Sequence, residues 1–189
     1  EWIERDAFVI CWLNRCVPRR LEVDDPDILG MLADRFQLGH PLADLRVFDT
    51  TLDIRVPSIL VWMRRPMDFG AGCFVGAACR ATPAAACTKA LIELAQCVPY
   101  SRLTMQLYEK WAPKEDFSDI WDFDRHSIFY MKRPDLIADS FRFLEQRQID
   151  GKLSELPAVS TGSVLGDLNH CVGELQRCGY EVLVVDLTT

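Results

Sequence analysis

The sequence lacks a long apolar run. No stretch reaches the roughly 18 residues that a membrane-spanning helix requires, because Arg, Asp or Pro interrupts each candidate. It also lacks an excess of positive charge: 21 Lys and Arg stand against 28 Asp and Glu, for a net charge of −7. A broad basic surface for nucleic-acid phosphates is therefore not expected. Neither a membrane nor a nucleic acid is an expected partner.

Cysteine motifs that bind zinc are missing. The pairs Cys11/Cys16, Cys73/Cys79 and Cys171/Cys178 have four, five and six residues between them, and no Cys-x-x-Cys occurs. Structural zinc is therefore not expected. The chain also starts without the basic and apolar segments of a secretory signal, so its eight cysteines do not indicate a disulfide framework. We expect reduced thiols in a cytoplasmic protein.

A glycine-rich phosphate loop is missing as well. No Gly-x-x-x-x-Gly-Lys-Ser/Thr sequence occurs, and the third glycine after Gly70 and Gly72 comes one residue too late for a dinucleotide fingerprint. We expect these two glycines in a turn before a strand. Any bound nucleotide would therefore be held through carboxylates and a metal ion.

Histidine is scarce, which limits the case for a thiol enzyme. Only His40, His126 and His170 could serve as the base, and His170 points to a different helix face from its neighbour Cys171. None of the three lies in a recognisable catalytic setting. A cysteine hydrolase is therefore not favoured.

The composition is that of a globular domain, or of part of one, with 49% hydrophobic and 26% charged residues in 189. Periodicity and capping residues predict helices over 1–16, 26–38, 83–99, 134–147 and 163–178. Alternating or β-rich runs predict strands over 45–49, 56–63, 73–79 and 180–186. The first three are expected to be neighbours in an antiparallel sheet. Residues 111–125 and 149–160 are expected to be irregular. This order of elements predicts an α+β fold with a mixed or antiparallel sheet packed with helices.

The first predicted helix carries an acidic pair beside a cation. Helical spacing puts Glu1, Glu4 and Arg5 on one face, with Asp6 elsewhere. A solvated surface helix could carry this pattern without any function. Magnesium, however, prefers hard oxygen ligands and commonly uses one or two carboxylates plus nucleotide phosphates, and Arg can bind a phosphate.

A second polar pair interrupts the apolar helix that follows Pro83. Glu93 and Gln96 are three residues apart within Ala-Leu-Ile-Glu-Leu-Ala-Gln. A solvated stripe with Thr88, Lys89 and Arg102 also accounts for them.

The two segments together resemble the YcaO family. Glu-x-x-Glu-Arg-Asp-Ala-Phe is followed about ninety residues later by Ala-Leu-Ile-Glu-Leu-Ala-Gln, and Gly76-Ala77-Ala78, Ser101 to Thr104 and the segment ending Val184 to Thr188 follow in family order. The resemblance implies that Glu4 and Glu93 bind Mg2+. It also implies that Glu1 contacts the metal or the nucleotide and that Arg5 contacts a phosphate. Gln96 would line the same nucleotide pocket, as would Arg102 in a register that differs among members.

The resemblance further implies an ATP-dependent enzyme. Such enzymes activate a backbone amide of a ribosomal peptide. A nucleophile adds to the amide carbonyl carbon, and the former carbonyl oxygen then accepts the γ-phosphoryl group of ATP. This oxygen finally leaves as phosphate. Cyclodehydration of Cys, Ser or Thr to azolines, as in bacteriocin biosynthesis, is the expected outcome. A thioamide-forming enzyme and a non-catalytic peptide-binding module are the alternatives.

The implied partners are a precursor peptide and an E1-like or TfuA-like protein, and a homodimer is compatible with the resemblance. The family also has an upstream half with a further Ser/Glu nucleotide motif, and a C-terminal tail. We therefore expect residues 1–189 to be the C-terminal part of a YcaO-like domain whose other segments lie outside this chain.

Overall fold

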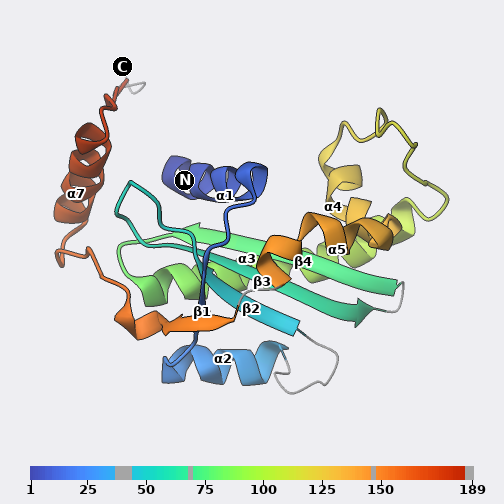
Figure 1. Cartoon of the computed structure of the whole chain (residues 1–189), viewed down its shortest axis with the longest axis horizontal. Coiled ribbons are helices and arrows are strands. Elements are labelled where there is room, and N and C mark those ends of the chain that lie inside the picture. The colour runs from blue at the N-terminus through green and yellow to red at the C-terminus, as the bar shows by residue number, and fades with distance from the viewer. Residues whose placement is uncertain (37–43, 68–69, 146–147, 186–189) are drawn as a thin grey trace.

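A computed structural model describes the chain except residues 37–43, 68–69, 146–147 and 186–189. Its centre is a five-stranded sheet in the order β4-β3-β2-β1-β5 (Figure 1). The strands are β1 Arg19–Glu22, β2 Asp44–Asp49, β3 Ser58–Met67, β4 Gly70–Cys79 and β5 Ile149–Lys152. All neighbours are antiparallel except β1 and β5, which are parallel. The predicted α+β class with a mixed sheet is thus confirmed.

Seven α-helices and two short 3-10 helices complete the part of the chain that the structure describes. The α-helices are α1 Trp2–Asn14, α2 Pro26–Phe36, α3 Pro83–Leu107, α4 Phe123–Lys132, α5 Ile137–Ser140, α6 Arg142–Glu145 and α7 Val164–Arg177. The 3-10 helices are η1 Pro134–Leu136 and η2 Leu153–Glu155. Within these segments no helix is long and apolar enough to cross a membrane.

Helices cover both faces of the sheet because side chains alternate between the faces along each strand. On one face, Ile59 and Val61 of β3 pack with α2, α3 and α4. On the other face, Leu60 and Trp62 pack with α1, α5 and α6. Figure 1 shows α1 and α3 on opposite sides of the strands.

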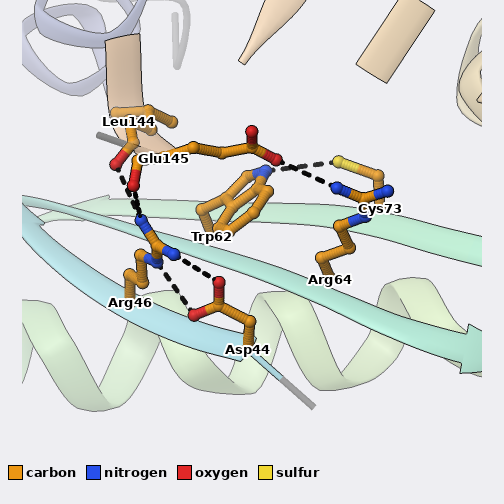
Figure 2. Close-up of polar contacts among 7 residues, drawn as sticks. All are labelled: Asp44, Arg46, Trp62, Arg64, Cys73, Leu144 and Glu145. Carbon is orange, nitrogen blue, oxygen red and sulfur yellow. Dashed lines mark hydrogen bonds and ion pairs between the residues drawn. The ribbon is translucent and has the colours of Figure 1, made fainter. Parts of the chain in front are cut away.

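On the second face, an arginine of β2 links the sheet to α6. Figure 2 shows the Arg46 guanidinium between the Asp44 carboxylate and the main chain of α6, where it donates to the Leu144 carbonyl oxygen at 3.2 Å and to that of Glu145. The same guanidinium lies 5.4 Å from the centre of the Trp62 ring. Arg46 therefore satisfies carbonyl groups at the end of a helix, which have no partner within the helix itself.

Local signals predicted most of these elements. Thr82 caps α3 by accepting a hydrogen bond from the Ala85 N–H at 3.2 Å, and Asp25 caps α2 by accepting from the N–H groups of Asp27 and Ile28. The predicted strands that correspond to β2, β3 and β4 and the helices near residues 1–16 and 163–178 are confirmed. The expected end of the second helix near Gly39 lies outside the described residues.

Several predicted boundaries are wrong. Gly70 and Gly72 lie within β4 and not in a turn. The helix that was expected to end at Pro99 continues to Leu107. Its extra turns bury Ser101 and Thr104, so tertiary packing outweighs the hydrogen bond that a proline removes.

The short elements were predicted less well. Residues 149–160 were expected to be a loop, yet they contain β5 and η2. The predicted helix over 134–147 is divided into η1, α5 and α6. Residues 180–185 of the predicted last strand have no strand partner among the described residues.

Candidate functional site

The candidate site lies along β4, which ends the sheet within the described part of the chain. The Arg80 N–H donates to the Pro57 carbonyl at 3.1 Å, whereas the Ser58 carbonyl accepts from the Thr50 N–H of the other neighbour at 2.9 Å. Cys79 is paired with Ser58, so its backbone groups point away from β3. The odd-numbered residues of β4 therefore present their N–H and C=O groups at this edge, which we call the β4 edge.

Glu4 of α1 occupies one end of the β4 edge. Its carboxylate accepts a hydrogen bond from the Cys79 N–H at 2.9 Å, and it lies 3.9 Å from the Arg80 guanidinium. The Glu4 side chain is 20% exposed. This carboxylate is thus partly buried, and Arg80 is its counter-ion.

The other members of the first motif surround Glu4 on the start of α1. Glu1 precedes the helix, and its carbonyl accepts the first helical hydrogen bond from the Arg5 N–H at 2.9 Å. The side chains of Glu1, Arg5 and Asp6 are exposed. They are accessible to a ligand, as a nucleotide contact requires.

Burial governs the chemistry of the thiol next to Glu4. Loss of solvent raises the pKa of Cys79 to about 11. The thiol is therefore protonated at neutral pH, which does not suit a nucleophile. This cysteine contributes to the β4 edge through its backbone N–H.

Helix α3 approaches β4 from the opposite face. A Cβ atom on Gly76 would lie only 2.2 Å from the Ala90 carbonyl oxygen, so glycine allows this close contact. The Cys97 thiol donates to the Val75 carbonyl at 4.0 Å, and Val75 is one of the odd-numbered residues of the β4 edge. Residues four apart share a helix face. The stripe formed by Lys89, Glu93 and Cys97 therefore follows the β4 edge.

Glu93 forms an ion pair within this stripe. Its carboxylate lies 2.8 Å from the Lys89 ammonium, and its side chain is 34% exposed. The solvated-stripe interpretation of the sequence also accounts for this pair. Gln96 is exposed beside Glu93, and Arg102 is exposed farther along α3.

The two predicted motifs, around Glu4 and around Glu93, both lie next to β4, but on helices that cover opposite faces of the sheet. Glu4 reaches the β4 edge from α1, and Glu93 lies on the stripe of α3 that follows the same edge. Among the described residues, no group of three or more His, Cys, Asp or Glu side chains could hold a metal ion. Glu4 and Glu93 are carboxylates, the ligand type that Mg2+ prefers, and in nucleotide sites this ion commonly takes one or two protein ligands plus phosphate oxygens.

Two basic residues of this site were missed as candidates in the sequence. Arg80 directly follows β4, and its contact with Glu4 spans more than seventy residues, so no local pattern indicates it. Lys89 was visible as part of the polar stripe, and its spacing of four residues from Glu93 is the signal for an ion pair.

Comparison with protein-family models decides the family. The model described as YcaO cyclodehydratase, ATP- and Mg2+-binding, matches residues 1–189. The chain belongs to the YcaO family. A search of curated proteins finds no match.

Two solved structures share the fold of this YcaO chain. One is described as the heterocyclase TruD, with a TM-score of 0.65 and 18% identity over 94% of this chain. The other is described as a heterocyclase in complex with substrate and cofactor, with a TM-score of 0.68 and 17% identity over 94% of this chain. In both cases this chain spans about 22% of the length of the solved one.

Proposed function

We propose that this YcaO chain takes part in ATP- and Mg2+-dependent activation of a peptide backbone amide. The expected reaction is cyclodehydration of Cys, Ser or Thr to an azoline in a ribosomally made peptide. The family description names ATP and Mg2+, and a structural neighbour is described as a heterocyclase with substrate and cofactor. The peptide substrate and its biosynthetic context are part of the proposal.

The observation that carries the proposal is the position of the two acidic motifs. Glu4 and the stripe that contains Glu93 lie at the same β4 edge, and each carboxylate is partly exposed beside a cation. Carboxylates in this state are accessible to a metal ion and are not locked in a buried ion pair. A purely structural role does not require both motifs at one edge.

Each side chain has a proposed role. Glu4 and Glu93 would bind Mg2+ through carboxylate oxygens, which are the ligands that this ion prefers. Glu1, Arg5, Gln96 and Arg102 would contact the nucleotide, with the Arg5 guanidinium on a phosphate. Bound ATP supplies the phosphoryl group that turns the amide oxygen into a leaving group. The remaining contacts would come from segments outside these residues.

The test uses the full-length protein with its precursor peptide, ATP and Mg2+. We expect phosphate release and the loss of one water per ring in the peptide mass, both abolished by Glu4→Gln and by Glu93→Gln. Glu155→Gln is a matched control: Glu155 also accepts from a backbone N–H, that of Lys152 at 3.1 Å, and pairs with Arg19 at 3.0 Å, but at the opposite end of the sheet.

The products separate the alternatives. Replacement of oxygen by sulfur in the peptide mass, dependent on a TfuA-like partner, would identify a thioamide-forming enzyme. If the wild-type protein binds the peptide without releasing phosphate, the chain acts as a binding module. Unchanged turnover in both glutamine variants would refute the metal-ligand roles of Glu4 and Glu93.

A further inference from the structure

We propose that Arg80 and Lys89 form a pair of exchangeable cations: each neutralises a metal-binding carboxylate in the free protein and binds nucleotide phosphate once Mg2+ occupies that carboxylate. The inference rests on the function proposed above and adds two residues to the site. Arg80 is paired with Glu4 at 3.9 Å, and Lys89 with Glu93 at 2.8 Å. Both proposed metal ligands thus have a cation within reach.

Both ion pairs can be exchanged for a metal because they are partly solvated. The Arg80 and Lys89 side chains are 43% and 38% exposed. Ion pairs at this exposure contribute little to stability and cost little to break. Mg2+ carries twice the charge of either side chain, and carboxylate oxygens are among its preferred ligands. The metal therefore competes well for Glu4 and Glu93.

Stabilisation of the helix does not explain the Lys89 pair well. The favourable order at this spacing places Glu before Lys, whereas here Lys89 precedes Glu93 by four residues. The Arg80 guanidinium has a second contact that fixes its position, because it donates to the Cys79 carbonyl at 2.6 Å. This contact holds its charge at the end of the β4 edge after the pair with Glu4 is broken.

A metal ion bound to Glu4 or Glu93 would have the same charge sign as the cation it displaces. Such a cation needs a new anion close by, and Mg2+ in nucleotide sites is itself bound to phosphate oxygens. Arg80 and Lys89 would then hold phosphate oxygens of the nucleotide through charge-assisted hydrogen bonds. The same two side chains would therefore oppose metal binding without nucleotide and favour nucleotide binding with metal.

The opposite effects of these cations on metal binding and on nucleotide binding give a test that does not depend on turnover. In the full-length protein, binding of Mn2+ alone is measured by electron paramagnetic resonance, and binding of a non-hydrolysable ATP analogue with Mg2+ by calorimetry. We expect Arg80→Met and Lys89→Met to tighten Mn2+ binding and to weaken analogue binding by about tenfold each. Lys152→Met, on β5 at the far end of the sheet, should change neither, and Lys89→Arg should restore analogue binding.

The outcomes distinguish this inference from the proposed function. Wild-type analogue affinity in both Met variants, together with lost affinity in Glu4→Gln and Glu93→Gln, would overturn the role of the cations and leave the metal site intact. Equal weakening of Mn2+ and analogue binding would also overturn it, because that pattern indicates a damaged fold. If the wild-type protein binds no analogue, the proposed function and this inference both fail.

Discussion

The Glu4 carboxylate accepts a hydrogen bond from the Cys79 backbone N–H, and this 2.9 Å contact joins the first turn of α1 to the β4 edge. It gives the carboxylate a fixed position and gives the strand end an acceptor for an N–H group that points away from β3. One residue therefore serves the fold and the proposed site together. The two roles can be separated by substitution.

Glu4→Ala should lower the free energy of unfolding by about 1 kcal/mol, because the Cys79 N–H loses its acceptor. Glu4→Gln retains a side-chain oxygen at that position and should unfold within about 0.5 kcal/mol of the wild type. Urea denaturation followed by circular dichroism measures both. Equal destabilisation of the two variants would mean that the charge, and not the hydrogen bond, stabilises this contact.

Gly76→Ala should lower the free energy of unfolding by about 1–3 kcal/mol, because the new Cβ would meet the Ala90 carbonyl oxygen at 2.2 Å and push α3 away from β4. Gly30→Ala in α2 is the matched control, since its Cβ has no neighbour within 4 Å. That control should raise stability by about 0.5–1 kcal/mol through helix propensity. Similar values for the two variants would argue against close contact between α3 and β4.

Arg46→Met should lower the free energy of unfolding by about 2 kcal/mol, because the end of α6 and the Asp44 carboxylate both lose their donor (Figure 2). Arg46→Lys should recover only part of this loss, since an ammonium cannot reproduce the fork of a guanidinium. Arg15→Met is the control: its pair with Asp139 is 3.6 Å long and about two-thirds exposed, so a change within about 0.5 kcal/mol is expected. A full recovery by lysine would contradict the proposed fork geometry.

The contact between α7 and residues 53–55 should weaken in acid. Hydrogen bonds from Arg177 and from the Arg55 N–H lower the pKa of Glu174 from 4.5 to about 2. Because the folded-state pKa is the lower one, this contribution is fully present above about 4.5 and is lost as the pH falls towards about 2. The stability difference between the wild type and Glu174→Gln should shrink across this range. A difference that is independent of pH would contradict the contact.

Local chemistry in the sequence predicted the central elements. Alternation over β2, the β-rich run of β3, and the Thr82 cap with Pro83 in the first turn of α3 are signals within a few residues. The strands β1 and β5 have four residues each, and they pair across more than 120 residues. Segments this short carry no readable period, and their pairing depends on the rest of the sheet.

In the candidate site, too, local patterns were predicted from the sequence, whereas long-range contacts were not. The Glu-x-x-Glu-Arg segment and the Glu93–Gln96 pair are local patterns, so resemblance could single them out before the fold was described. The β4 edge is a product of strand order, which placed Glu4 beside Cys79 and Arg80. The opposite-face placement of α1 and α3 also follows from topology and has no signal in either motif. The pairing of Arg80 with Glu4 therefore required the structure, whereas the spacing of Lys89 and Glu93 already indicates their ion pair.

The proposed binding of Mg2+ and ATP at the β4 edge through Glu4 and Glu93 can be measured by calorimetry of the full-length protein with Mg2+ and a non-hydrolysable ATP analogue. We expect micromolar binding by the wild type and by Glu155→Gln, and loss of about 3 kcal/mol or more of binding free energy in Glu4→Gln and in Glu93→Gln. Wild-type affinity in both of these variants, with their folds intact by circular dichroism, would contradict it.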